Sequence, residues 1–391
     1  MITKEIIEYL SCSADCFYIY DEEIIISQIK KLKSNFHNIK FLYSIKANPN
    51  LDVLKCMFLN GFGADAASLG EVMLAKQSGL KTEDIYFSAP GKTPNDIINS
   101  INNSVIIADS FSEIENINKI AFDMNINVEI GIRINPNFTF LDDNGLPSKF
   151  GIDEEQIFQS KSRLKNYSNI KIVGIHTHLK SQELNHNSIF NYYQKMFELA
   201  IKFQNEFNIA LSFLNLGSGL GIQYSKDEPC LNVEELAHKT NIILNNFKMK
   251  YPKTKIIIET GRFVIGNAGY FVTKVLDKKV SRGKTFIILK DTLNSFMRSV
   301  LTQIIDKPIE PLFTCKNSFQ ILTFNNNSEF ECVTLTGNIC SQADIIANDI
   351  KLQKLDIGDF IALTNAGSYA LTLSPINFSS KEKPKEFFIS K

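Results

Sequence analysis

The chain has 391 residues, 44% of them hydrophobic, which is enough to bury a large core and favours one large barrel plus a second domain. Its 42 Lys and Arg residues balance 42 Asp and Glu residues, and no run of like charges is long enough to indicate a nucleic-acid or membrane partner. Seven scattered cysteines without CxxC spacing favour reduced thiols and a cytoplasmic location. Neither a signal peptide nor an apolar stretch of membrane-spanning length is found.

Strands and helices are predicted to alternate from the start of the chain as far as Glu259. A short strand is expected at residues 16–21, and a helix follows at residues 22–36. Several later strands are continuous apolar runs, as strands buried on both faces should be. The eight strands that follow are expected at residues 39–46, 61–65, 84–89, 104–110, 128–134, 171–178, 211–216 and 255–259. This alternation indicates an α/β fold, a (β/α)8 TIM-like barrel over residues 22–265.

Three predicted helix starts agree with this phasing. Ser68 with Glu71 has the spacing of a capping box, and residues 110 and 113 repeat it. Thr93 lies before a proline at the first helical position.

The rhythm changes beyond Arg262 to short β-like runs with little helical periodicity. These runs lie at residues 270–277, 285–291, 319–324, 330–336 and 359–366. We therefore expect a C-terminal β-rich domain of residues 266–391, completed by the N-terminal segment of residues 1–21.

Six polar or glycine positions fall at the carboxyl ends of different predicted barrel strands. Because all strand ends of a closed barrel open onto one face, these positions are expected to converge on a single ligand. They are Lys46, Asp65, Arg133, His178, Gly217 and Glu259.

Eight motifs occur in a fixed order along nearly the whole chain: YSIKANPN, FGADAASLGE, SKFGI, GIHTHLKSQ, LNLGSGLGI, ETGR, GNICSQAD and NAGSY. With these motifs the chain resembles the pyridoxal-phosphate-dependent decarboxylases of the alanine-racemase fold (fold type III), which include ornithine, arginine and diaminopimelate decarboxylases. The resemblance implies pyridoxal 5'-phosphate as cofactor and removal of the α-carboxylate from an amino acid or an amino-acid conjugate.

The resemblance also assigns roles inside the barrel. Lys46 matches the Schiff-base lysine, and an amine at a strand end is expected to be desolvated and nucleophilic. Glu259 matches the carboxylate that keeps the cofactor's ring nitrogen protonated, so that the ring accepts electrons. His178 matches the imidazole that stacks on the ring. His176 lies two residues earlier on the same strand face and is expected to be a structural core histidine.

The phosphate group is expected at the LNLGSGLGI turn, where small residues let backbone N–H groups approach an anion. The family's triple glycine is interrupted here by a serine. The residues that match the family's phosphate contacts are Gly217, Ser218, Gly219, Arg262, Ser181 and Tyr369.

Asp65 and Arg133 match residues that line the barrel near the cofactor and pair with each other. A structural ion pair and a direct catalytic role are equally open for them. With only 5 histidines and no HExxH spacing, a bound metal is not expected.

Cys340 and Asp344 match a pair that the family donates to the partner subunit's active site. The resemblance therefore implies a homodimer with shared sites, in which Cys340 returns a proton to the substrate carbon and Asp344 lies at the interface near Lys149. Arg298 matches an arginine that grips a substrate carboxylate. Where diaminopimelate decarboxylases follow the cysteine with a glutamate, this chain has Ser341.

That departure favours a substrate other than diaminopimelate, such as a conjugated amino acid of siderophore or other specialised metabolism. For a diamine-forming substrate, Asp291 or Asp344 are the candidate partners of the distal amine. Two other readings stay open: an amino-acid racemase of the same fold, and a non-catalytic regulator of a decarboxylase. Glu259 and the Cys340 motif disfavour the first, and an intact Lys46 disfavours the second.

Overall fold

The computed structural model describes residues 2–217, 219–298 and 319–390. The chain divides into two compact units. The barrel unit comprises Ile29–Gly221 and Cys230–Gly261, and the β unit comprises Met1–Gln28, Ile222–Pro229 and Arg262–Lys391. The boundaries predicted from the sequence, before residue 22 and after residue 265, stay a prediction.

The barrel unit contains a closed parallel sheet, as expected. Its strands follow the order β5-β4-β3-β2-β10-β9-β8-β6, and pairing of β5 with β6 closes the ring. The short strand β7 (Ile152–Asp153) pairs in parallel with the carboxyl end of β6. The barrel strands are β2 (Ile39–Ser44), β3 (Gly63–Ala66), β4 (Ile85–Phe87), β5 (Val105–Ala108), β6 (Val128–Asn135), β8 (Ile170–His176), β9 (Phe213–Asn215) and β10 (Lys255–Thr260).

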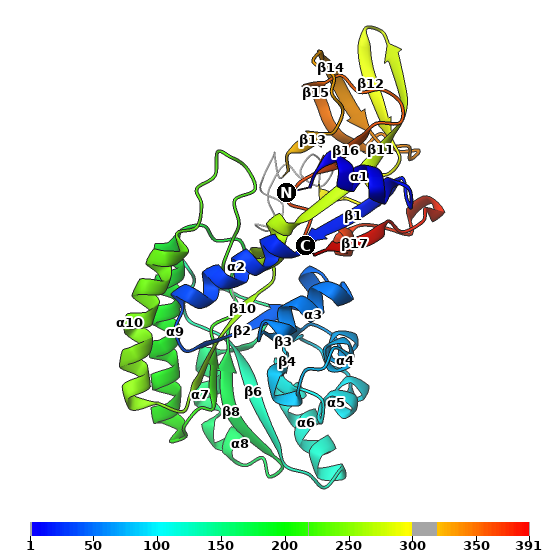
Figure 1. Ribbon diagram of the computed structural model, residues 1–391. Helices are drawn as coiled ribbons and strands as arrows, with labels where there is room; N and C mark the ends of the chain where they lie inside the picture. Colours follow the sequence, from blue (N-terminus) through cyan, green and yellow to red (C-terminus); the bar gives the residue numbers. More distant parts are fainter. Residues whose placement is uncertain (1, 218, 299–318, 391) are drawn as a thin grey trace. The chain divides into compact units, whose positions relative to one another are not determined.

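Helices alternate with these strands and lie around them, as Figure 1 shows. The helix α2 (Glu22–Asn35) contains the division between the two units. The other helices of the barrel unit are α3 (Leu51–Leu59), α4 (Leu69–Gln77), α5 (Pro94–Ser100), α6 (Phe111–Asp123), α7 (Glu154–Gln159), α8 (Lys161–Lys165), α9 (His186–Phe207) and α10 (Val233–Lys250). The fold class predicted from the sequence is therefore confirmed.

The helix caps were only partly predicted. Thr93 forms a complete capping box at α5 with Asp96. The hydroxyl of Ser68 accepts from the N–H of Glu71, but the Glu71 carboxylate accepts from Ala67 instead of the cap residue. At α6 the carboxylate of residue 113 likewise leaves its cap and pairs with a lysine. A buried or nearby donor competes successfully with the cap in both cases.

The barrel interior is filled by a cluster of large side chains opposite small ones. Phe213 packs edge-on against Tyr86, with ring centroids 5.2 Å apart. Its ring occupies the space beside Gly131 and Gly174, where an added Cβ would overlap it. These glycines are therefore required by packing.

The β unit is a mixed sheet with the order β13-β16-β11-β12-β14-β15. Strand β1 (Cys16–Asp21) pairs antiparallel with β11 and parallel with β17, so the N-terminal segment completes this domain as predicted. Strands β15 and β17 were not predicted. The remaining elements are α1 (Lys4–Ser11), α11 (Arg262–Ile265), β11 (Gly269–Ser281), β12 (Lys284–Leu289), β13 (Ile321–Thr323), β14 (Phe330–Thr336), β15 (Ile345–Gln353), β16 (Phe360–Leu363) and β17 (Lys385–Ile389).

Among the described residues, no helix combines the length and the apolar character needed to cross a membrane.

Substituting Gly174→Ala should lower the free energy of unfolding by about 1–3 kcal/mol, because the new methyl group overlaps the Phe213 ring. Gly70→Ala, in the open first turn of α4, is the control and should be neutral or stabilising by about 0.5–1 kcal/mol. Adding Phe213→Leu should recover part of the loss. Chemical denaturation followed by circular dichroism measures all three, and a wild-type midpoint for Gly174→Ala would contradict the packing argument.

Candidate active site

The carboxyl ends of the barrel strands bring together an amine and a buried acid. Lys46 lies in the turn η1 (Ile45–Ala47) that follows β2, and its Nζ is 3.3 Å from Oδ2 of Asp65 on the neighbouring β3. The other oxygen of Asp65 accepts a hydrogen bond of 2.9 Å from the Ser88 hydroxyl. Asp65 is fully buried, whereas the Lys46 side chain is 45% exposed. The expected desolvation of the amine is therefore wrong for the described residues, because the carboxylate, not the amine, is the buried partner.

A second buried acid lies where side chains of three adjacent strands meet. Oε1 of Glu259, on β10, accepts a 2.9 Å hydrogen bond from Nδ2 of Asn215 on β9. The same oxygen lies 3.2 Å from Nε2 of His176 on β8. His176 pairs in register with Asn215, whose register partner on β10 is Ile257, and Glu259 follows two residues later on the same face of that strand. His176 is thus more than a core histidine, because it contacts the one acid on which the expected chemistry depends.

The charge of Glu259 is set by these neighbours. Burial alone would raise the pKa of its carboxyl group, but His176, His178 and Lys46 lower that pKa well below the usual range. The carboxylate is therefore ionised throughout the neutral pH range.

The turn after β9 is fixed to the same acid. Oδ1 of Asn215 accepts a 2.9 Å hydrogen bond from the N–H of Gly217, whose own carbonyl accepts from the N–H of Glu259 at 2.8 Å. Gly217 has φ of 64°, and an added Cβ would overlap the carbonyl oxygen of Thr177. Only glycine fits this position. Ser218 lies outside the described residues, and the carbonyl of Gly219 accepts from Glu183 at 2.8 Å.

His178 follows β8 and is partly exposed. Its Nε2 lies 3.2 Å from the hydroxyl of Ser181, and its backbone carbonyl accepts from Arg133 at 3.4 Å. Burial lowers the pKa of His178 to about 3, against the opposing effect of Glu259. The imidazole is therefore neutral at neutral pH, a flat polarisable ring without charge.

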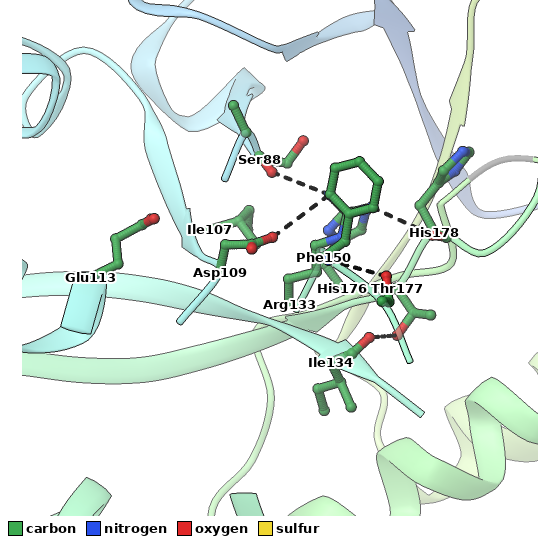
Figure 2. Close-up of polar contacts among 12 residues, drawn as sticks. Ser88, Ile107, Asp109, Glu113, Arg133, Ile134, Phe150, His176, Thr177 and His178 are labelled. Atoms are coloured by element: carbon green, nitrogen blue, oxygen red, sulfur yellow. Dashed lines mark hydrogen bonds and ion pairs between the residues drawn. The ribbon is translucent and has the colours of Figure 1, made fainter. Parts of the chain in front are cut away.

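Arg133 contacts residues from several segments of the barrel unit, as Figure 2 shows. Its guanidinium lies 3.8 Å from Asp109, donates to the carbonyl of Ser88 at 3.5 Å and reaches His178 on the other side. The ring of Phe150, from the SKFGI motif, lies over it with 4.3 Å between Cζ and the ring centroid. The expected ion pair between Arg133 and Asp65 is wrong, because the oxygens of Asp65 bind other partners and Asp109 takes its place.

In the β unit, Arg262 begins α11 and is nearly fully buried. One terminal nitrogen donates to the hydroxyl of Tyr224, and the guanidinium lies 4.8 Å from the ring centroid of Tyr369. The other terminal nitrogen has no hydrogen-bond partner among the described residues. A buried, unsatisfied N–H on a permanent cation is suited to an anionic ligand. Tyr369 has φ of 51°, a strained conformation for a bulky residue.

Arg298 is buried in the same unit. It donates to the carbonyl of Asn365 at 2.7 Å and to that of Ser368, and its guanidinium lies 5.2 Å from the Tyr224 ring centroid. Burial would raise the pKa of Tyr224, but Arg262 and Arg298 lower it overall. Asp291 is buried as well, and one of its oxygens accepts from Ser295 at 3.0 Å.

The motif GNICSQAD forms a loop organised by Asp344. One oxygen of its buried carboxylate accepts from the hydroxyl of Thr292 and from the N–H of Leu293 at 3.1 Å, and the other accepts from Ile339 at 3.0 Å. Cys340, next to Ile339, is exposed. The loop therefore presents a thiol on a fixed backbone.

Glu71 is the first acid of α4 and neighbours the Lys46 site. Its carboxylate accepts a 2.7 Å hydrogen bond from Ala67, but burial raises the pKa of Glu71 to about 7, and Asp65 adds to the rise.

Each unit, taken by itself, offers donors that suit a part of pyridoxal phosphate. The barrel unit offers an amine for an aldehyde, an ionised acid for a ring nitrogen and a neutral flat ring for the ring face, in Lys46, Glu259 and His178. The β unit offers a buried guanidinium with a spare N–H for a phosphate, in Arg262. No group of three or more His, Cys, Asp or Glu side chains in the described part of the chain could hold a metal ion.

Comparison with known proteins points the same way. A family model described as "Pyridoxal-dependent decarboxylase, pyridoxal binding domain" matches residues 22–266. The L-glutamyl-[BtrI acyl-carrier protein] decarboxylase of Niallia circulans is 29% identical over 381 residues, 95% of this chain and 87% of that protein. The diaminopimelate decarboxylase of Helicobacter pylori strain J99 is 28% identical over 376 residues, 94% and 88% of the two chains. A crystal structure of the Helicobacter pylori enzyme with L-lysine has a TM-score of 0.84 at 27% identity, covering 98% of this chain and 93% of that one.

Glu71→Gln should make folding stability less dependent on pH. The folded-state pKa of Glu71 is raised to about 7, so protonated Glu71 favours the folded state of the wild type. This contribution to folding stability is complete below about pH 4.5 and is lost as the pH rises through 7. Glutamine cannot ionise. Between pH 5 and pH 8, the difference in free energy of unfolding between variant and wild type should therefore change in favour of the variant by on the order of 1–3 kcal/mol. Thermal unfolding at both pH values measures the difference. Glu198→Gln, exposed on α9, is the control, and parallel pH profiles of wild type and Glu71→Gln would refute the prediction.

Proposed function

The chain belongs to the pyridoxal-dependent decarboxylase family and is a pyridoxal-phosphate-dependent amino-acid decarboxylase, and from this premise we propose that it acts on an amino acid whose distal group is conjugated. The observation that carries the proposed site is the juxtaposition of Lys46 and the ionised Glu259 at the carboxyl ends of strands in one barrel. The substrate proposal rests on Ser341, where an acid is absent beside Cys340.

Pyridoxal phosphate, when bound, supplies an electron-accepting ring for the electron pair released as CO2 leaves. Lys46 would hold it covalently through Nζ, and Asp65, fixed by the Ser88 hydroxyl, orients that amine. Glu259 would hold a proton on the ring nitrogen. The neutral ring of His178 would lie against the ring face and fix its plane.

The phosphate end would be bound by backbone and side-chain donors. The spare N–H of the buried Arg262 supports this role, and Gly217 leaves its turn without a side chain at a positive φ. We assign the phosphate contacts to Gly217, Ser218, Gly219, Ser181, Arg262 and Tyr369.

The active site is proposed to be completed by a second copy of the chain. Cys340 is exposed on its loop and would return a proton to the substrate carbon in the partner's barrel. Lys149 is also exposed and would contact the partner subunit near Asp344. Because the carboxylate of Asp344 binds three donors of its own unit, it holds the loop in shape, which leaves less capacity for the expected substrate contact.

The substrate is proposed to carry an acyl or similar conjugate at its distal end. The relative from Niallia circulans is named for a glutamyl group on an acyl-carrier protein, which is a conjugated amino acid. A hydroxyl at Ser341 suits a neutral distal group better than an ammonium. Arg298 would bind a substrate carboxylate, and Asp291, the other candidate beside Asp344, is buried and could meet a distal amine. A siderophore precursor is one conjugate that fits this description.

The six described cysteines are free thiols, which supports the proposal that the enzyme works in the reducing cytoplasm.

Release of CO2 from a substrate panel tests the proposed function. The panel contains L-ornithine, L-lysine, L-arginine, meso-diaminopimelate, citryl–diamino acid conjugates and a carrier-linked glutamyl thioester. We expect a conjugate to be turned over best, because no acid follows Cys340 to bind a distal ammonium. Lys46→Ala should lose the visible absorption of the bound coenzyme and at least about 10³-fold in turnover, whereas Lys55→Ala, exposed on α3, should keep both.

Preference for meso-diaminopimelate over every conjugate would contradict the substrate proposal and leave the decarboxylase activity intact. Unchanged absorption in Lys46→Ala would contradict the role of Lys46 itself.

Mixing inactive Lys46→Ala and Cys340→Ala subunits should restore activity, because each mixed dimer would contain one barrel and one thiol that are both intact. With random mixing half of the dimers are mixed and half of their sites are intact, so about one quarter of the wild-type activity is expected. A mixture of Lys46→Ala with Glu259→Gln is the control and should stay inactive, because both defects lie in the barrel unit. No recovery in the first mixture would refute shared sites.

A further inference from the structure

Two buried polar residues of the barrel have no part in the proposed chemistry. His176 is 1% exposed and Asn215 is fully buried. Polar side chains in a barrel interior lower stability unless they are hydrogen-bonded, and aliphatic side chains would fill the same space at lower cost. Both residues direct a nitrogen at the same atom, Oε1 of Glu259.

Strand order and register bring these residues together. Strands β8, β9 and β10 are consecutive neighbours in the sheet, and the parallel register places residue 176 beside residue 215. The orientation of the Asn215 amide is not free, because its Oδ1 accepts from the N–H of Gly217. Its NH2 group must therefore point to Glu259.

His176 is not satisfied as a structural histidine would be. Both ring nitrogens are buried without a hydrogen bond of good geometry to the described residues, so its polar contact in this part of the chain is the 3.2 Å approach of Nε2 to the acid. Other charged or titratable groups that interact electrostatically with Glu259 are His178, Lys46, Arg133 and Tyr192. His176 and Asn215 contact the carboxylate itself, from the two neighbouring strands.

We infer that His176 and Asn215 are positioning residues that hold Glu259 in one orientation as an ionised carboxylate, and so determine whether a bound pyridine nitrogen keeps its proton. The inference rests on the proposed function of Glu259. It extends that function to the two residues that make the acid an effective partner. The lowered pKa of Glu259 agrees with this assignment.

The test is the ¹⁵N resonance of ring-labelled pyridoxal phosphate bound to the full-length protein, together with the dissociation constant of the coenzyme. In the wild type the resonance should report a protonated ring nitrogen. His176→Leu removes the imidazole that contacts the acid, so Glu259 should take the shared proton, the resonance should move toward the unprotonated value and coenzyme binding should weaken roughly 10- to 100-fold. His176→Gln restores an N–H at a similar reach and should return both readouts close to wild type.

Two controls separate the possible failures. His238→Leu, exposed on α10, should change neither readout. Glu259→Gln should give the unprotonated resonance, and if it does not, the proposed role of Glu259 and this inference both fall. If Glu259→Gln shifts the resonance and His176→Leu leaves it at the wild-type position, the positioning role alone is refuted. Should His176→Leu not fold, Asn215→Ala must show the same direction of change, and an unchanged resonance there refutes the inference equally.

Discussion

A single ionised acid buried inside a barrel constrains much of the structure around it. A charge in this position is unfavourable unless polar groups surround it, and the strand order supplies a hydrogen-bond donor from β9 and an imidazole from β8. Asn215 must then keep its amide turned toward Glu259, which requires the N–H of Gly217 at its other end. Gly217 in turn needs a positive φ beside the carbonyl of Thr177. The glycine turn that a phosphate would occupy is therefore linked through two hydrogen bonds to the acid that a ring nitrogen would contact.

A second set of buried charges stabilises the other side of the barrel, where β5 and β6 close the ring. Lys92 donates to the carbonyl of Ile107 at 2.7 Å and to Glu113 at 2.7 Å, although burial lowers the pKa of Lys92. Arg133 crosses from β6 to the carbonyl of Ser88. The loop after β4 is thus held by two cations from either end. Because Ser88 also donates to the acid beside the Lys46 amine, these cations support the site through the backbone of that loop.

The sequence predicts the repetitive part of the molecule well, since long apolar runs and glycine turns repeat with the barrel. It misses β15 and β17 because their residues are half-exposed and carry polar groups without a clear alternation. It also assigns the partner of Arg133 wrongly. Charge counting along the chain cannot show that the oxygens of Asp65 are already taken by a lysine and a serine hydroxyl. The role of His176 is missed for the same reason, although the spacing H-x-H, which places two imidazoles on one strand face, was a signal that could have raised it.

Asp344 shows where a motif and its geometry give different information. The spacing between Cys340 and Asp344 suggests two groups acting on a ligand, yet the carboxylate accepts three hydrogen bonds from its own unit and is buried. Its carboxylate therefore orders the backbone that carries the exposed thiol. The residue that follows the thiol is a serine, so this loop offers a distal substrate group a hydroxyl and not a charge. Recognition of a cationic side chain would have to come from another part of the chain, whereas a neutral conjugate needs no such partner.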